Sequence, residues 1–302
     1  HIAPQDVIVA STGVIGQPLD LAPIRTGLPQ LAAALGDHSD QAAEGIMTTD
    51  TQPKEIAVQF TAGGKTCTIG GIAKGSGMIH PNLATMLVFL TTDCAISAPM
   101  LHAALTGDVQ DTFNMVSVDG DTSTNDMVAV LANGLAGNTE ITAPGADFTA
   151  FCRALNSVTV WLCRRIAGDG EGATRLIECC VTGAEDHATA KTVAKSIVCS
   201  SLVKAAMFGE DANWGRVLCA IGYAGADIDI NKVDVSFKSA YGQVDVCVNG
   251  AGINFSEEEA AKVLHEKEIT ILVELNSGDA EAEAFGCDLT YDYVKINGDY
   301  RT

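Results

Sequence analysis

Thr85 is the residue whose type and setting come nearest to those of a nucleophile. It follows Ala84, after a glycine-rich loop that begins at Lys74, and it precedes an apolar run from Met86 to Leu90. A threonine hydroxyl reacts poorly unless a base lies beside it. Cleavage before Thr85 would supply that base, because a free α-amino group titrates near neutral pH. By itself the Ala-Thr dipeptide is common, and a plain strand edge is the alternative interpretation.

Three other places suggest acyl-transfer chemistry. At Thr12-Gly13, glycine lets a backbone N–H point into a cavity and the threonine hydroxyl adds a second donor, as an oxyanion requires. Glu171 stands between two glycines and could meet a cationic amine, while Lys74 could hold a carboxylate or tune a neighbouring amine. The plainer interpretations are a strand-to-turn junction, a solvated acid and a surface lysine.

Other motifs are incomplete. Gly64-Lys65-Thr66 lacks the first glycine of a Walker loop, and neither Gly75-Ser76-Gly77 nor Gly250-Ala251-Gly252 has the third glycine of a dinucleotide site. A calcium loop that began at Asp119 would need glycine at position 124 and glutamate at 130, where the chain has Thr124 and Val130. We interpret residues 119–126 as a hydrogen-bonded active-site loop that opens a helix at Met127.

The run at residues 74–87 resembles the ornithine acetyltransferase family, the bifunctional enzymes of arginine biosynthesis. The family pattern is Lys-Gly-Ser-Gly-Met-Ile-x-Pro-Asn-x-Ala-Thr-Met-Leu, and this chain carries it. Five further segments resemble family motifs in the same order: 10–16, 47–51, 119–126, 209–216 and 287–302. The resemblance covers essentially the whole chain, with weaker matching at 140–165 and 225–285.

The resemblance implies a role for each of several residues. Thr85 is the nucleophile, freed by cleavage between Ala84 and Thr85, and Thr12 and Gly13 form the oxyanion hole. The implied substrate contacts are Thr51, Lys74, Thr85, Glu171, Asn297 and Thr302. No metal and no organic cofactor is implied.

The implied reaction moves an acetyl group from N-acetylornithine to glutamate through an acetyl ester on Thr85. Two self-cleaved chains are expected to form a heterotetramer, and acetyl-CoA as a further donor stays open. An aminopeptidase or amidohydrolase with the same nucleophile and water as acceptor is one alternative. A non-catalytic acidic interaction module, never cleaved, is another. Family members carry a further segment before the Ser-Thr-Gly motif, so we expect this chain, which starts at His1, to lack it.

Composition excludes several classes of protein. The net charge of -20, from 18 basic and 38 acidic residues, argues against binding to nucleic acid or an anionic membrane. No apolar run approaches the length of a membrane span. The ten cysteines are spread out with no Cys-x-x-Cys pair, and the histidines are scattered, so no zinc site is indicated. This pattern fits a reducing compartment, and we expect a cytoplasmic protein.

Strands and helices alternate without regular βαβ spacing, which predicts an α/β or α+β protein. We expect a layered sandwich of sheets flanked by helices, similar to the fold of the ornithine acetyltransferases and DmpA-like aminopeptidases. Residues 1–205 form the expected catalytic domain, and 206–302 a smaller α+β domain whose tail returns to the active site. The predicted helices are 21–36, from Ser97 through Leu105, 127–135, 146–167, 187–207 and 256–265. The predicted strands are 7–10, 55–60, 66–72, 176–181, 228–230, 233–237, 244–248, 269–275 and 291–296.

Overall fold

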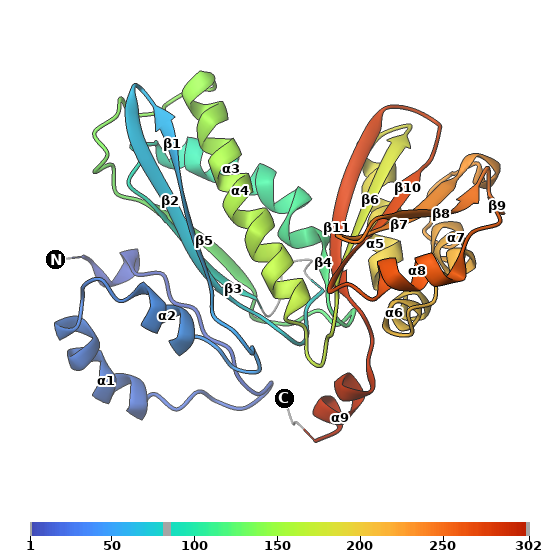
Figure 1. Ribbon diagram of the computed structural model, residues 1–302. Coiled ribbons are helices and arrows are strands. Elements are labelled where there is room, and N and C mark those ends of the chain that lie inside the picture. Colours follow the sequence, from blue (N-terminus) through green and yellow to red (C-terminus); the bar gives the residue numbers. More distant parts are fainter. Residues whose placement is uncertain (1, 81–85, 300–302) are drawn as a thin grey trace.

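The computed structural model describes residues 2–80 and 86–299 (Figure 1). Two sheets dominate this part of the chain, and they pack in layers with helices. Ala84, Thr85 and Thr302 lie outside the described residues. The predicted α/β class, with sheets flanked by helices, is confirmed.

The first sheet has four strands in the order β1-β2-β3-β5. Its strands are β1 (Lys54–Ala62), β2 (Lys65–Lys74), β3 (Leu87–Thr92) and β5 (Met127–Ala132). The hairpin between β1 and β2 turns through Gly63 and Gly64, both with positive φ, where a side chain would be strained. The strands β3 and β5 run parallel, with Leu87 opposite Met127.

The second sheet has seven strands in the order β4-β11-β6-β10-β7-β8-β9. Its strands are β4 (Val116–Ser117), β6 (Leu176–Ala184), β7 (Asp234–Lys238), β8 (Gln243–Val248), β9 (Ala251–Gly252), β10 (Glu268–Glu274) and β11 (Ala280–Cys287). In the sequence the short β4 lies between β3 and β5 of the first sheet, but it pairs with β11 of the second sheet, so the chain connects the two sheets at this point.

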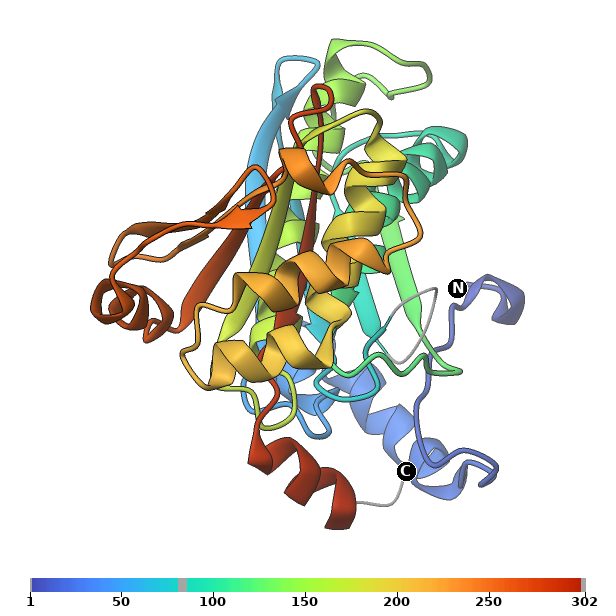
Figure 2. The same ribbon diagram turned by 90° about the vertical axis from the view of Figure 1, so that its right-hand side faces the viewer.

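Helices form the other layers. The amphipathic α4 (Ala146–Gly168) lies between the sheets and contacts β1 and β2 on one side and β6 and β11 on the other, with α3 (Ala98–Asp111) beside it (Figure 1). Beyond the second sheet lies α5 (His187–Cys199), which packs on β6 and β11 (Figure 2). The remaining helices around this sheet are α6 (Ser201–Phe208), α7 (Trp214–Gly222) and α8 (Glu257–Leu264).

Three helices gather at one end of the molecule. They are α1 (Ala22–Ala33), α2 (Ser39–Gly45) and α9 (Tyr291–Asp299), and both views place them below the sheets (Figures 1 and 2). Single 3-10 turns occur at Pro4–Asp6, Phe113–Met115 and Ile230–Lys232. The first and last parts of the described chain therefore meet at the same end.

Five predicted elements were wrong. Residues 127–135 are not a helix, because Met127–Ala132 pair with β3 as strand β5. Residues 291–296 are not a strand but part of α9, and the predicted helix 187–207 breaks at Ser200, whose hydroxyl caps α6. Residues 7–10 and 228–230 form no strand. The loop 119–126 consequently opens a strand rather than a helix.

The other predicted helices and strands are present, with bounds shifted by a few residues. Ser256 caps α8 by accepting a bond from the Glu259 amide at 3.2 Å. The second sheet takes strands from both sides of residue 205, and the domain boundary there stays a prediction. None of the described helices has both the length and the apolar character needed to cross a bilayer.

Candidate active site

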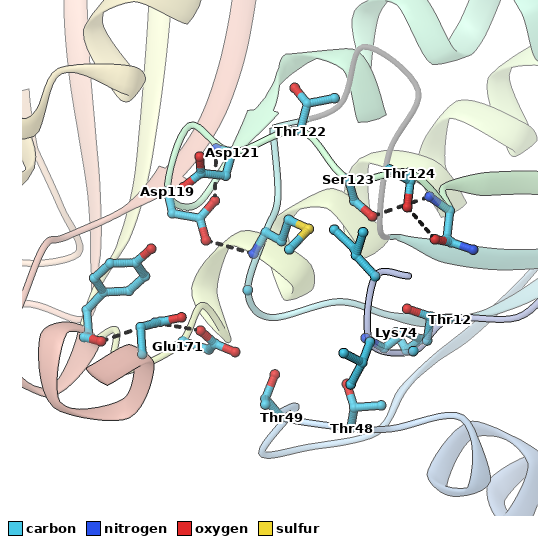
Figure 3. A pocket seen from close by; sticks show the side chains of 18 residues that line it. Thr12, Thr48, Thr49, Lys74, Asp119, Asp121, Thr122, Ser123, Thr124 and Glu171 are labelled. Atoms are coloured by element: carbon cyan, nitrogen blue, oxygen red, sulfur yellow. Dashed lines mark hydrogen bonds between the residues drawn. The ribbon is translucent and has the colours of Figure 1, made fainter. Parts of the chain in front are cut away.

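A cavity of about 400 Å³ opens where six segments of the chain converge (Figure 3). They are the N-terminal segment, the turn before β1, the loop after β2, the 119–125 loop, the loop after α4 and helix α9. Its lining residues are Thr12, Gly13, Val14, Ile15, Thr48, Thr49, Lys74, Gly77, Met78, Asp119, Asp121, Thr122, Ser123, Thr124, Asn125, Glu171, Tyr293 and Asn297. Five of the predicted site residues thus share one cavity: Thr12, Gly13, Lys74, Glu171 and Asn297.

Thr12 and Gly13 reach the cavity on an extended segment before the first helix. The segment is tied to the opposite wall by Asn125, whose side-chain amide donates to the Ser11 carbonyl at 3.1 Å. Thr124 in turn donates to the Asn125 side-chain oxygen at 2.6 Å. This chain of bonds places the hydroxyl and the backbone of Thr12-Gly13 at the cavity rim.

Lys74 ends β2 and is almost fully buried apart from its contact with the cavity. Its ammonium lies 3.8 Å from a carboxylate oxygen of Asp50. Burial lowers the pKa of Lys74 below the usual lysine value, and this effect is opposed by Asp50, Glu171 and Asp126. A buried cation that faces an open cavity is suited to bind an anionic group.

Glu171 lies on the loop after α4 and lines the same cavity as Lys74 (Figure 3). It is 8% exposed, and the Asn297 side-chain amide donates to its carboxylate at 2.8 Å. A Cβ on Gly77 would collide with the Glu171 carboxylate, so a larger residue at position 77 would require this carboxylate to move. The bond to Asn297 joins Glu171 to helix α9.

Asp119 organises the loop that carries Gly77. Its carboxylate accepts a bond from the amide of Met78 at 2.7 Å (Figure 3) and another from the amide of Ile79 at 3.1 Å. Met78 has φ of 54°, an unusual value for a residue with a side chain. The burial of Asp119 raises the pKa of its carboxyl group, although the amide bonds oppose the shift.

Thr51 does not line this cavity. Its amide and hydroxyl both donate to Asp169, with an amide distance of 3.1 Å, and it borders a neighbouring hollow. The nearby hydroxyls that do line the active cavity belong to Thr48 and Thr49. The Met-Thr-Thr-Asp-Thr motif thus reaches the cavity through residues other than the one we predicted.

Sequence analysis also missed Tyr293, because residues 291–296 were interpreted as a strand. The side chain lines the cavity from α9, and its burial, with Asp119 and Asp121 nearby, raises the pKa of the phenol. The sequence did hold a signal for the helix. Thr290 accepts a hydrogen bond from the Tyr293 amide at 3.3 Å, as an N-cap threonine does.

Thr85 and Ala84 lie outside the described residues, but Met86 does not. Met86 is buried just before β3, its amide donates to the Asp126 carboxylate, and its carbonyl accepts from the Met127 amide at 2.8 Å. Asp126 follows directly on the cavity-lining stretch that ends at Asn125. Among residues 2–80 and 86–299, no group of His, Cys, Asp and Glu side chains could hold a metal ion.

Comparison with known proteins places this fold. The family model described as "ArgJ family" matches residues 1–302. Arginine biosynthesis bifunctional protein ArgJ 1 of Clostridium acetobutylicum is 52% identical over all of this chain and 74% of its own length. The ArgJ protein of Symbiobacterium thermophilum is 54% identical with the same coverage. The crystal structure of ArgJ from Bacillus halodurans, 47% identical, covers 72% of this chain and all of its own, with a TM-score of 0.68.

The fold and these relatives together define an enzyme of the acyltransferase class. The chain belongs to the ArgJ family, which is the ornithine acetyltransferase family that its motifs resemble.

Proposed function

We propose that this chain transfers an acetyl group from N-acetylornithine to glutamate, giving ornithine and N-acetylglutamate. The observation that carries the proposal is the cavity itself. It brings Thr12 and Gly13, Lys74, Glu171 and Asn297 together from the two ends and the middle of the chain. These groups match the needs of acyl transfer between amino acids: donors for an oxyanion, a cation for a carboxylate and a carboxylate for an amine.

The proposed reaction begins with self-cleavage between Ala84 and Thr85. The freed α-amino group of Thr85 takes the hydroxyl proton as Oγ attacks the acetyl carbonyl carbon. The oxyanion accepts hydrogen bonds from the Thr12 hydroxyl and the Gly13 amide. When the tetrahedral intermediate collapses, the amide C–N bond breaks and the ornithine nitrogen takes the proton from the α-ammonium group. An acetyl ester on Thr85 remains.

The second half reverses the roles. The amino group of glutamate attacks the acetyl carbonyl carbon and passes a proton to the α-amino group of Thr85, while the oxyanion forms at the same donors. When this intermediate collapses, the ester C–O bond breaks, the α-ammonium group returns the proton to Thr85 Oγ and N-acetylglutamate leaves. Lys74 binds the substrate carboxylate and Glu171, held by Asn297, binds the amine of the ornithine side chain. Thr51 and Thr302 are proposed as further substrate contacts. One site thus serves both amino acids in turn, because each presents a carboxylate to Lys74.

The relatives support this assignment, since their names describe bifunctional proteins of arginine biosynthesis. We further propose that the two cleaved chains assemble as a heterotetramer in the cytoplasm, with acetyl-CoA as a second acetyl donor.

The deciding experiment is an assay with N-acetylornithine and glutamate, with mass spectrometry of all products. We expect N-acetylglutamate and ornithine in equal amounts, and no ornithine without an acceptor beyond a single turnover. Acetate formed in step with ornithine, whether or not glutamate is present, would identify the hydrolase alternative. A chain of intact mass with no turnover would point to the non-catalytic module. Replacing N-acetylornithine by acetyl-CoA, with glutamate kept as the acceptor, tests the second donor.

Glu171→Gln tests the assignment of the amine contact. The neutral side chain keeps its shape, but it loses the charge that would hold an ammonium group. We expect KM for N-acetylornithine to rise about tenfold or more, because a hydrogen bond to a charged group contributes about 1.5–3 kcal/mol. Glu178→Gln is the matched control, since Glu178 is a partly buried acid paired with Arg164 and does not line the cavity. Equal effects of the two substitutions would contradict the role of Glu171.

A further inference from the structure

Lys54, the first residue of β1, is a charged side chain with no exposed surface. Its ammonium lies 2.7 Å from a carboxylate oxygen of Asp50 and 2.6 Å from one of Asp169, both of which are also buried. Fully buried lysines are rare, and burying three charges costs desolvation energy that a hydrophobic replacement would avoid. A purely stabilising role therefore explains this cluster poorly.

The two acidic partners of Lys54 hold segments that line the active cavity. Asp50 accepts the amides of Gly75 at 2.7 Å and Thr48 at 3.1 Å. The Asp169 carbonyl accepts the Ser76 hydroxyl at 2.7 Å, and the Ser76 carbonyl accepts the Glu171 amide at 3.1 Å. The turn before β1, the loop after β2 and the loop after α4 are therefore all fixed to the two partners of Lys54.

Lys74 is the second cation near Asp50, but it is held differently. Its ammonium is 3.8 Å from Asp50, beyond hydrogen-bond distance, whereas Lys54 is in direct contact. Burial raises the pKa of Asp50, but Lys54 and the Gly75 amide outweigh it and leave the pKa below the usual value. Asp50 is therefore a carboxylate whose charge is balanced chiefly by Lys54.

We propose that Lys54 is a positioning residue, which occupies Asp50 and Asp169 so that the Lys74 ammonium stays directed to the cavity and available to a substrate carboxylate. The two lysines thus interact with Asp50 in different ways. Lys54 neutralises its charge through direct contact, whereas Lys74 is only attracted to it from a longer distance. This inference rests on the proposed function in one respect, namely that Lys74 binds the carboxylate of the amino-acid substrate.

Removing the charge of Lys54 tests the proposal. In Lys54→Met, Lys74 becomes the nearest cation to an unbalanced Asp50, and we expect it to be drawn away from the cavity. KM for N-acetylornithine should rise about tenfold, the scale of one hydrogen bond between charged groups, with kcat changed much less. A KM within a factor of about two of the wild-type value, in folded enzyme, overturns the proposal.

The pH profile gives a readout that a merely structural role would not move. The charged groups that act on Lys74 are Asp50, Lys54, Glu171 and Asp126. Without Lys54, the pKa of Lys74 rises, so the alkaline loss of substrate affinity should move to higher pH. Without the negative charge of Asp50, in Asp50→Asn, that pKa falls and the loss should move to lower pH. Shifts in the same direction overturn the proposal, since general loosening of the site treats both variants alike.

Lys204→Met is the matched control. Lys204 is also a buried lysine, but its ammonium bonds to the Cys287 carbonyl and it does not line the cavity. We expect this variant to be less stable, with KM and the alkaline limb unchanged. A KM rise equal to that of Lys54→Met would show that any buried lysine produces the effect. If Lys54→Met does not fold, Asp50→Asn decides alone, and an unmoved alkaline limb overturns the proposal.

A second measurement separates this inference from the proposed function. Brief labelling with acetic anhydride, followed by peptide mass spectrometry, reports how readily the Lys74 amine reacts at each pH without any substrate. We expect the labelling curve of Lys74 to move to higher pH in Lys54→Met and to lower pH in Asp50→Asn. Opposite shifts in enzyme that transfers no acetyl group would reject the proposed function and keep the charge arrangement. Active enzyme with unshifted curves would reject the role of Lys54 alone.

Discussion

The two sheets of this protein bury charge in different ways. Around the four-stranded sheet, the buried Asp50, Lys54 and Asp169 contact one another, and the buried Lys74 and Glu171 line the cavity beside them. Around the seven-stranded sheet, the close bonds are to backbone groups: Lys204 donates to the Cys287 carbonyl, and Asp288 accepts the amides of Thr174 and Arg175, with the Arg175 guanidinium 3.8 Å away. The rest of that core is apolar, from Val193 and Ile197 of α5 to Ile271 of β10.

This difference suggests that the seven-stranded half contributes chiefly to stability, whereas the charges near the cavity chiefly position the groups that act on the substrate. A charge that satisfies a backbone group closes a local gap in hydrogen bonding, and its loss lowers the free energy of unfolding. A network of buried charges gains little net stability, but it fixes the distances between groups that must act together. Substitutions in the seven-stranded half should therefore change stability more than kinetics, and substitutions near the cavity should do the reverse.

The largest effect is expected for Thr85→Ala. It removes the proposed nucleophile, so cleavage and acetyl transfer should both be lost, by roughly a thousandfold or more in rate. Electrophoresis under denaturing conditions should show one chain in place of two, and N-terminal sequencing of the wild-type fragment should begin Thr-Met-Leu. Because the apolar core is untouched, urea unfolding should change little. Wild-type protein that transfers acetyl groups as a single intact chain contradicts the mechanism.

Phe237→Ala is the opposite case, a large loss of stability with little kinetic effect. Phe237 is fully buried in β7, between β10 and β8 of the second sheet. Truncation of a core phenylalanine costs about 3–5 kcal/mol, from lost burial and the cavity left behind. Urea unfolding measures this cost, and the folded fraction should keep the wild-type KM for both substrates. Phe237→Leu is the control that restores most of the side-chain volume. A raised KM in either variant would contradict the expectation that the seven-stranded half affects stability and not substrate binding.

Deleting residues 297–302 tests whether the C-terminal tail affects activity without affecting stability. No described side chain of α9 is buried in a core, yet Asn297 holds Glu171 at 2.8 Å. We expect activity to fall about a hundredfold, because small displacements of a substrate contact have large kinetic costs. The melting temperature should stay nearly constant. Activity within a factor of about two of wild type would remove Asn297 and Thr302 from the proposed site.

The sequence predicted α4 and the β1–β2 hairpin well because local pattern and tertiary environment agree there. The long apolar face of residues 146–167 fits the layer between two sheets, and Gly63-Gly64 suits the turn. It failed at Met127–Ala132, where alternating Val128 and Val130 pair with β3 although the same stretch can be interpreted as helical. It failed again at α9, where tyrosine, valine and isoleucine favour a strand but the Thr290 cap starts a helix.

The candidate site divides in the same way. Thr12, Gly13, Lys74, Glu171 and Asn297 were found through motifs, and the cavity brings them together. The cluster of Lys54 with Asp50 and Asp169 was not found, since 115 positions separate Lys54 from Asp169 and no local pattern marks a buried ion pair. Such contacts depend on how the layers pack, and the packing of distant segments is the feature of a fold that is hardest to predict from a single sequence.

The smallest expected effect lies at the joint between the two halves. Lys195 of α5 is largely buried, and its ammonium donates to the carbonyls of Asn114 at 2.8 Å and Val116 at 2.6 Å, just where β4 crosses to the second sheet. Burial lowers the pKa of Lys195 to about 8. Between about pH 8 and the ordinary lysine value near 10.4, the unfolded chain therefore binds more protons than the folded one, and the free energy of unfolding gains a term that increases with pH.

Lys195→Met isolates this term. Urea unfolding of both proteins at about pH 7 and about pH 9.5 gives the change in stability with pH for each. Wild type should gain more, or lose less, than the variant over this interval, because only wild type loses a buried positive charge. Other titrating groups, such as the cysteines, are common to both proteins and cancel in the difference. Equal changes in the two proteins would mean that Lys195 keeps its proton over this interval as a solvated lysine does, and that burial at this position does not lower its pKa.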